Sequence, residues 1–247
     1  MSIWSNNGYT VEYTQDGSPT LKGVTENMHH SGGAASETKY IYGKSLEWIY
    51  QENLSPRVLI IGLGLGYIEI LTVYFHILQR RNGNPADLEM TSYESDPFLV
   101  RSFLEFLLGA ATEESNQVYS GVLNALVPPE DQLAVRAELS ELRKKGRWTI
   151  QGALKKPFLD LNSYSSKNKY NVIQYDAYSS KTSEELWQEE FLISFIEAHA
   201  ESNSVFATYA CVGSLKRALA KSNFLNETRA GFQGKRDSTF AYRKTKS

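Results

Sequence analysis

The sequence predicts an α/β fold: a doubly wound, Rossmann-like domain with a seven-stranded, mostly parallel sheet and an antiparallel edge. The run Val-Leu-Ile-Ile at residues 58–61 is followed at once by a glycine-rich turn, which is typical of a strand buried on both faces that leads into a helix. Strand-like and helix-like segments then alternate along the chain, as they do in parallel sheets with helical crossovers. Two adjacent strand-like segments close the sequence and predict the antiparallel edge.

The first half of the chain supplies two of these strands. Alternating apolar residues ahead of an Asp-Gly-Ser-Pro turn predict an N-terminal hairpin over residues 9–24. Ser36 is expected to cap a helix that ends before Pro56. A long helix follows the first strand to about Gln79, and residues 88–93 have the composition of a second strand.

The second half begins with a long helical pattern from residue 98 to about residue 145, broken by two prolines. It is longer than an ordinary crossover, so we expect two or three helices that form a small cap. The remaining strands are expected at residues 148–150, 172–175, 204–209, 224–229 and 238–242. Residues 1–247 are then a single domain, with an N-terminal extension at about 1–35 and a helical insertion at about 98–145.

Composition excludes several classes of protein. The 26 basic residues stand against 28 acidic ones, and the net charge of −2 excludes a uniformly basic nucleic-acid coat while leaving a local basic face possible. The single Cys211 and four scattered histidines predict neither an internal disulfide nor a metal site. No leader-like start and no membrane-length apolar run is present, so a soluble, cytoplasmic protein without a membrane partner is expected.

Two features predict a nucleoside cofactor. The turn Gly62-Leu63-Gly64-Leu65-Gly66 has its third glycine one position earlier than the dinucleotide fingerprint, which favours a ligand without a pyrophosphate. Glu94 ends the second strand, where a carboxylate can accept hydrogen bonds from both ribose hydroxyls of an adenosine. The alternatives are a tight turn that binds nothing and an exposed carboxylate at a strand end.

Asp176 and Tyr178 follow the fourth strand, at the expected switch point of the sheet. Methylation of an amine needs a carboxylate or a backbone carbonyl to orient the nitrogen, and an aromatic ring can hold a planar substrate by stacking. The alternative is that Asp176 caps the next helix and Tyr178 lies in the core.

Charge is distributed unevenly. From Lys216 to Ser247 nine basic residues stand against two acidic ones, a local net charge of +7. A second basic cluster lies at residues 143–147. Either cluster could contact an RNA phosphate backbone, and a solvated basic face is the alternative.

Further motifs give a resemblance to a known family. Residues 37–40 read Glu-Thr-Lys-Tyr, and the C-terminal part carries an ordered string of motif residues. That string is Phe206-Ala207-Thr208-Tyr209, Gly213, Lys216-Arg217, Leu219, Phe224, Gly231-Phe232 and Lys235-Arg236-Asp237. From about Met28 to Arg243 the chain therefore resembles the methyltransferase half of the MnmC-type tRNA-modifying enzymes, in a stand-alone form.

The resemblance implies a class I fold that binds S-adenosyl-L-methionine and an activity on tRNA. The expected reaction is N-methylation of the aminomethyl group on the wobble uridine of the anticodon loop, the last step of 5-methylaminomethyl-uridine formation. A separate oxidoreductase or another aminomethyl-uridine-forming enzyme would supply the substrate, and no metal is expected. The implied catalytic residues are Asp176 and Tyr178. The implied cofactor-binding residues are Glu37, Tyr40, Gly62, Leu63, Gly64, Gly66, Glu94, Ser95, Gly152, Ala153 and Asp176. The implied RNA-binding residues are Lys216, Arg217, Phe232, Lys235 and Arg236.

The chain also departs from the family pattern. Gly152-Ala153 stands where the family has Gly-Asp, which removes a side chain expected to contact the adenine amino group. Residues 176–180 read Asp-Ala-Tyr-Ser-Ser in place of Asp-Gly-Phe-Ala-Pro. Two alternatives therefore stay open: methyl or aminopropyl transfer to a small-molecule or protein amine, and a degenerate methyltransferase fold that binds without catalysis.

Overall fold

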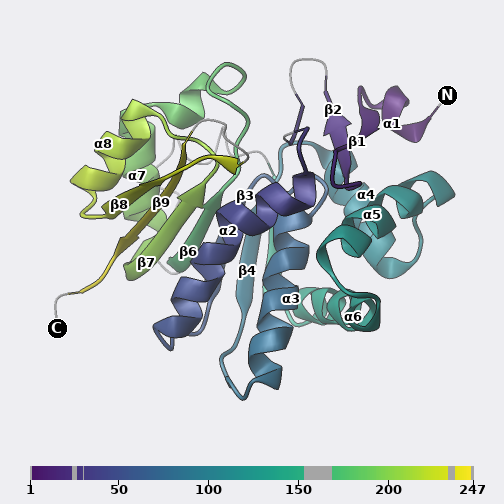
Figure 1. Cartoon of the computed structure of the whole chain (residues 1–247), viewed down its shortest axis with the longest axis horizontal. Helices are drawn as coiled ribbons and strands as arrows, with labels where there is room; N and C mark the ends of the chain where they lie inside the picture. Colours follow the sequence, from purple (N-terminus) through teal and green to yellow (C-terminus); the bar gives the residue numbers. More distant parts are fainter. Residues whose placement is uncertain (1, 24–26, 30, 153–168, 233–236, 246–247) are drawn as a thin grey trace.

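A seven-stranded sheet forms the centre of the computed structural model, which describes residues 2–23, 27–29, 31–152, 169–232 and 237–245 (Figure 1). Its strands are β3 (Arg57–Ile61), β4 (Glu89–Tyr93), β5 (Trp148–Gln151), β6 (Tyr170–Tyr175), β7 (Ala200–Thr208), β8 (Leu225–Arg229) and β9 (Ser238–Arg243). They lie in the order β5-β4-β3-β6-β7-β9-β8. The first five are parallel, and β9 runs antiparallel to both β7 and β8. The predicted sheet with its antiparallel edge is confirmed.

Helices cover both faces of the sheet. On one side lie α2 (Ala34–Gln51), α3 (Tyr67–Arg81), α4 (Pro97–Leu108), α5 (Glu113–Leu126) and α6 (Pro129–Lys144). On the other lie η2 (Glu184–Trp187), α7 (Glu189–His199) and α8 (Gly213–Lys221). Along β3, Val58 and Ile60 belong to the first core cluster, while Leu59 and Ile61 belong to the second. Because successive side chains of a strand point to opposite faces, this continuous apolar run is buried on both.

Strand register brings the chemistry-bearing residues to one edge of the sheet. Ile61 pairs with Tyr93 on one side and with Tyr175 on the other. Three parallel strands therefore end level with one another, and the next residue along each, Gly62, Glu94 and Asp176, lies at the same edge. This is where doubly wound sheets bind ligands.

The predicted helical segment after β4 consists of three helices. α4 begins at the Asp96 cap, whose side chain accepts a hydrogen bond from the Phe98 amide. α5 and α6 then pack against α3, and α5 also contacts the N-terminal hairpin. Figure 1 shows α4 and α5 beside the sheet, beneath the N-terminal elements. None of their described residues lines the cavity reported below, so they thicken the helical layer instead of covering the site.

A short helix and a hairpin precede the sheet. They comprise α1 (Ile3–Asn6), β1 (Thr10–Tyr13) and β2 (Pro19–Lys22), so the predicted hairpin is confirmed. Trp4 anchors this unit, because its buried ring packs edge-on against Phe98 of α4. The predicted cap of α2 is wrong: Gly33 occupies that position, and Ser36 lies in the first turn. The competing partner is Asp16 in the hairpin turn, whose carboxylate accepts hydrogen bonds from the Ser36 amide and hydroxyl.

Asp16 joins the hairpin to α2, and its replacement by alanine is expected to weaken that junction. Burial raises its pKa, but hydrogen bonds from Ser18, Ser36 and Thr14 outweigh burial and hold the pKa well below its usual range. The carboxylate is exposed, so we expect a loss of only about 1–2 kcal/mol in the free energy of unfolding at neutral pH. Because the folded pKa is depressed, the difference should shrink as the pH falls below about 4.

Chemical denaturation of the wild type and of Asp16→Ala, at neutral pH and below about pH 4, measures the difference in the free energy of unfolding. The matched control is Asp87→Ala, which removes an exposed ion pair with Arg147 and should cost well under about 1 kcal/mol. Equal losses for both variants would mean that Asp16 does not join the two elements.

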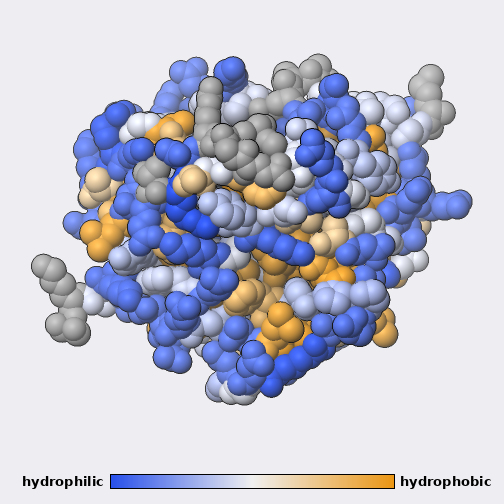
Figure 2. Space-filling view, in the orientation of Figure 1, coloured by the Kyte–Doolittle hydropathy of each residue, from blue (hydrophilic) through white to orange (hydrophobic). Residues whose placement is uncertain are grey.

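Apolar side chains gather on one face of the molecule over the lower part of α3 and the helices beside it (Figure 2). Tyr74, Phe75 and Ile77 of α3 are half-buried and pack against the larger core cluster. Among the described helices, none combines the length and the apolar character needed to cross a membrane.

Candidate active site

A cavity of about 830 Å³ opens at the carboxyl ends of the parallel strands. This volume suits a nucleoside-sized ligand together with part of a second molecule. Its walls come from the turn after β3, the residues after β4, β6 and β7, the first turns of α2, and the segment that follows the hairpin. The sequence-predicted residues among its described lining are Glu37, Gly62, Leu63, Gly64, Glu94, Ser95, Asp176, Tyr178 and Phe232.

The three glycines of the turn have different roles. All have positive φ, between 51° and 93°, a backbone region that favours glycine. A Cβ on Gly62 would lie 2.5 Å from the Asp176 carbonyl oxygen, and one on Gly66 would lie 2.5 Å from the Phe103 ring. A Cβ on Gly64 would meet only the Met28 sulfur, at 3.7 Å. Gly62 and Gly66 are therefore needed for packing, and Gly64 leaves space open to the cavity.

Gly66→Ala is expected to lower the free energy of unfolding by about 2–4 kcal/mol, because the added methyl group collides with a buried ring and the backbone is strained. Gly83→Ala is the matched control, since Gly83 has a φ of 86° but nothing within 4 Å of the added Cβ. It should cost only about 1 kcal/mol, from backbone strain alone. Denaturant midpoints compare the two, and equal costs would contradict the packing role of Gly66.

Glu94 is held by backbone groups on both of its oxygens. Oε2 accepts the Gly64 amide at 2.9 Å, and Oε1 accepts the Asp96 amide at 2.9 Å. Burial raises its pKa, and these hydrogen bonds act in the opposite direction. The carboxylate fixes the glycine turn and also lines the cavity, so it is placed to meet a ligand that lies over Gly64.

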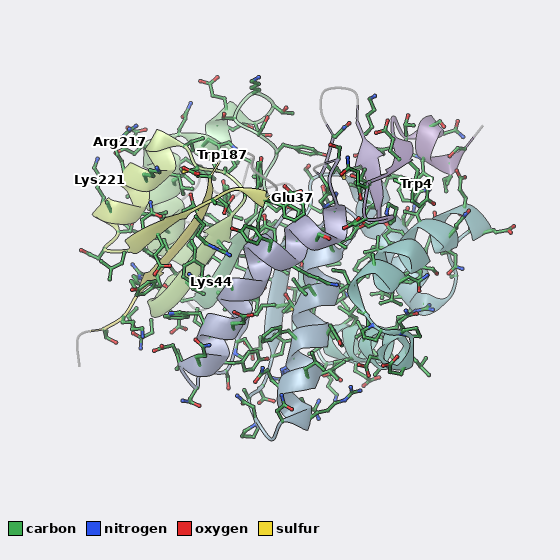
Figure 3. The ribbon with its side chains drawn as sticks, in the orientation of Figure 1. Trp4, Glu37, Lys44, Trp187, Arg217 and Lys221 are labelled. Carbon is green, nitrogen blue, oxygen red and sulfur yellow. The ribbon has the colours of Figure 1, made fainter. Side chains whose placement is uncertain are left out.

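The cavity has an acidic lining. Glu37, Glu94 and Asp176 contribute carboxylates, and no lysine or arginine is among its described lining residues. Figure 3 shows Glu37 at the upper end of α2, near the centre of the molecule. Such a lining attracts a cationic ligand and disfavours a pyrophosphate.

Asp176 is half-buried at the end of β6. Its amide donates to the Ile61 carbonyl at 2.8 Å, and its Oδ1 accepts the Tyr42 hydroxyl at 2.6 Å. Burial raises its pKa to about 7, the Tyr42 hydrogen bond lowers it, and the nearby charges of Glu37 and Glu94 raise it. The alternative role as a helix cap is not realised, because Ser183 precedes η2.

Aromatic side chains surround the segment that follows Asp176. Tyr178 lines the cavity, and the Trp187 indole donates to its carbonyl oxygen at 2.7 Å. The Tyr209 hydroxyl donates to the Ala177 carbonyl oxygen at 2.9 Å. Trp187 and Tyr209 line the cavity as well, and Figure 3 places Trp187 across from the hairpin. The walls beside Asp176 therefore suit a planar substrate.

The segment after the hairpin forms one wall of the cavity, and no sequence motif predicts that it contacts a ligand. Asn27, Met28, His29 and Ser31 line the cavity. The His29 ring is 4.8 Å from that of Tyr67, and its Nδ1 lies 3.1 Å from the Thr20 hydroxyl. Burial lowers its pKa to about 4, so the ring is neutral at physiological pH. These are loop positions without periodicity, and nothing in their spacing indicates a site.

Other expected site residues lie elsewhere. Tyr40, Gly66 and Gly152 are not among the residues that line the cavity. The Tyr40 ring instead lies under the Arg229 guanidinium, at 4.5 Å, and 6.1 Å from Phe232. Ala153, Lys235 and Arg236 lie outside the described residues.

Several of the C-terminal basic residues are engaged within the protein. Arg217 and Lys221 both pair with Glu189, and Lys244 pairs with Glu52. Arg243 donates to three backbone carbonyl groups. Figure 3 shows Arg217 and Lys221 on the outer face of α8, far from Glu37. The local charge of +7 therefore overstates the number of cations available to a partner.

Residues 150–244 match a family model described as S-adenosyl-L-methionine-dependent methyltransferase. Over this part, the chain is similar to that family of methyltransferases. The crystal structure of MnmC2 from Aquifex aeolicus is similar over 97% of this chain and 72% of that one, with a TM-score of 0.66 and 20% identity. The predicted Rossmann-like fold, the cofactor and the resemblance to MnmC-type methyltransferase domains are confirmed.

An uncharacterised protein of Methanocaldococcus jannaschii is 26% identical over 243 residues. The alignment covers 93% of this chain and 58% of that relative, so the chain spans little more than half of the relative's length.

Proposed function

We propose that this protein is an S-adenosyl-L-methionine-dependent methyltransferase that transfers a methyl group to the aminomethyl nitrogen of a wobble uridine in tRNA, the last step of 5-methylaminomethyl-uridine formation. The observation that carries the proposal is the half-buried carboxylate of Asp176, which lies beside Tyr178 and Trp187 in an acidic cavity. A carboxylate next to aromatic walls suits an amine attached to a planar base.

The described residues fit the cofactor. Its sulfonium and ammonium groups are cations, and the lining offers Glu37, Glu94 and Asp176, with no competing lysine or arginine among the residues that the structure describes. Gly64 leaves room for close approach, and Glu94 at the end of β4 is placed for the ribose hydroxyls. Gly62, Leu63 and Ser95 line the same cavity and complete the proposed set, whereas Tyr40, Gly66 and Gly152 lie outside its lining and would act only through their neighbours. When bound, S-adenosyl-L-methionine supplies an activated methyl group.

The residues around Asp176 then have to align a neutral amine with that methyl group. The nitrogen forms the new N–C bond as the sulfur–methyl bond breaks, and the extra proton on nitrogen passes to Asp176 or to water. Tyr178 and Phe232 would stack on the uracil and its neighbour. An anticodon-loop base is poorly stacked, so extruding it costs a few kcal/mol or less.

Contacts to tRNA would come from Lys216, Arg217, Lys235 and Arg236. Exposed ion pairs such as Arg217 with Glu189 contribute about 0–1 kcal/mol, so phosphate groups can compete for these cations. A separate enzyme would form the aminomethyl group. The proposed organisation is a single domain over residues 1–247, with an extension at about 1–35 and an insertion at about 98–145.

The test is transfer of labelled methyl from S-adenosyl-L-methionine to tRNA that carries aminomethyl-uridine, with mass analysis of the nucleosides and a parallel cofactor-binding titration. A methylaminomethyl nucleoside, formed at a rate that falls with rising salt, supports the proposal. Cofactor binding without transfer to tRNA would contradict it.

A small-molecule amine is the second candidate acceptor. The internal pairing of Arg217, Lys221 and Lys244 favours it, because those cations are not fully available to a phosphate backbone. Transfer to free amines that is independent of salt would identify this acceptor class.

A further inference from the structure

We propose that Tyr42 is a positioning residue that orients the Asp176 carboxylate and keeps it ionised at the pH at which the acceptor amine must lose a proton. This inference rests on the proposed function in one respect, the assignment of Asp176 as the group that meets the amine.

The contact itself is short and shielded. Tyr42 lies on α2 with 3% of its surface exposed, and its hydroxyl donates to Asp176 Oδ1 at 2.6 Å. Burial and the adjacent carboxylate raise the pKa of Tyr42 well above its usual value, so the hydroxyl stays protonated and acts only as a donor to the ionised carboxylate. A hydrogen bond to the charged form of an acid lowers its pKa.

The other groups that act on Asp176 do not take over this role. Glu37 on α2 and Glu94 after β4 both raise its pKa through their charges. The buried Glu69 on α3 interacts with the same carboxylate, and its own pKa is raised to about 8 by burial, so it carries little charge at neutral pH. Among the described residues, Tyr42 is thus the hydrogen-bond donor that opposes burial and like charge at this site.

The backbone of the same segment is already hydrogen-bonded. The carbonyl of Ala177 accepts the Tyr209 hydroxyl, and that of Tyr178 accepts the Trp187 indole. Three aromatic donors, from α2, η2 and the end of β7, therefore bind three consecutive residues. One of the two acceptor positions on each carbonyl oxygen is therefore occupied, and of these groups only the Asp176 carboxylate can also take a proton, so it is the group placed to accept the substrate's N–H.

Tyr42→Phe removes the hydroxyl and keeps the ring. The matched control is Tyr50→Phe on the same helix, where a buried hydroxyl is hydrogen-bonded to His76 at 2.7 Å, outside the cavity. Both variants lose one buried hydrogen bond, so a general loss of stability affects both. Only Tyr42→Phe should raise the pKa of Asp176.

The first measurement is the pH profile of methyl transfer from about pH 5 to about pH 9. For Tyr42→Phe we expect the acid limb of kcat/KM to move up by about 1–2 pH units, the effect of losing one hydrogen bond to a charged group. At neutral pH kcat should fall about tenfold, because a smaller fraction of Asp176 is ionised. In an Asp176→Asn background the same substitution should have no further effect on rate. An unmoved acid limb, or equal effects in both backgrounds, would overturn the proposal.

A second measurement does not depend on the acceptor. The affinity for S-adenosyl-L-methionine is measured by calorimetry over the same pH range, because ionised Asp176 attracts the cationic cofactor. The midpoint of this dependence should move up in Tyr42→Phe and stay unchanged in Tyr50→Phe. If tRNA is not methylated but the midpoint moves, the proposed function fails and the role of Tyr42 stands. An unmoved midpoint overturns the role of Tyr42.

Should Tyr42→Phe not fold, site-specific 3-fluorotyrosine at position 42 replaces it. Its more acidic phenol donates a stronger hydrogen bond, so the midpoint should move down. A midpoint that stays the same or moves up contradicts the proposal.

Discussion

Asp176→Asn is expected to lower kcat for methyl transfer by about 10²–10⁴-fold, the range that a positioned acid–base group contributes. The amide can still accept the Tyr42 hydroxyl, so the local geometry should persist, but it can neither take a proton nor carry a charge. The affinity for cofactor should fall much less than the rate. The measurements are single-turnover methyl transfer and a parallel binding titration.

The pH dependence sharpens this prediction. The pKa of Asp176 is raised to about 7, so the wild-type rate should increase with pH through that value as the carboxylate ionises. The Asp176→Asn profile should lack this limb. Turnover retained at neutral pH with an unchanged profile would exclude proton removal by Asp176.

The same substitution should stabilise the cofactor-free protein. An acid whose folded pKa is raised lowers the free energy of unfolding progressively between its usual pKa, near 4, and its folded pKa, near 7. Asp176→Asn removes that penalty. We expect a gain of about 1–3 kcal/mol at about pH 8, discounted because the carboxylate faces an open cavity, and little change at about pH 4. Asp87→Asn on the surface should change stability at neither pH.

Glu94→Gln is expected to raise the Kd for S-adenosyl-L-methionine by about 10–100-fold. Two causes add: the side chain loses its charge beside a cationic ligand, and one of its two backbone hydrogen bonds, to Gly64 or to Asp96, is lost. The glycine turn is then held less firmly. Calorimetric titration of the cofactor measures the change.

The matched control is Glu89→Gln at the opposite end of the same strand. Glu89 is exposed and lies 3.5 Å from Arg57, so its neutralisation should leave the Kd unchanged. Equal affinities for the Glu94 and Glu89 variants would show that Glu94 does not contact the cofactor.

The sheet could be predicted because its strands obey local rules. The apolar run of β3, the glycine turn and the proline-bounded helices all act within a few residues. The neighbourhood of Gly62, Glu94 and Asp176 follows from parallel strands ending level, and the register of Ile61 with Tyr93 and Tyr175 confirms it.

Contacts between distant segments could not be predicted in this way. Tyr42 meets Asp176 across 134 positions of sequence, and the helical pattern of α2 only marks Tyr42 as a core residue. The local sequence predicts Ser36 as a helix cap, but in the fold the Ser36 amide donates to the carboxylate of Asp16, 20 positions earlier in the chain. The number of charged residues in the sequence likewise does not predict that Arg217 and Lys221 form ion pairs with Glu189.

The position of β9 constrains how the molecule assembles. This strand follows β8 in sequence but lies between β7 and β8, and it contributes the buried side chains Phe240 and Ala241. Among the described strands β8 pairs with β9 alone, so β8 has no described partner until β9 inserts. The strands therefore cannot join the sheet in the order in which the ribosome synthesises them, because the last strand lies between two earlier ones. Ser238, at the start of β9, also lines the cavity, so the ligand pocket is completed only when that late insertion has occurred.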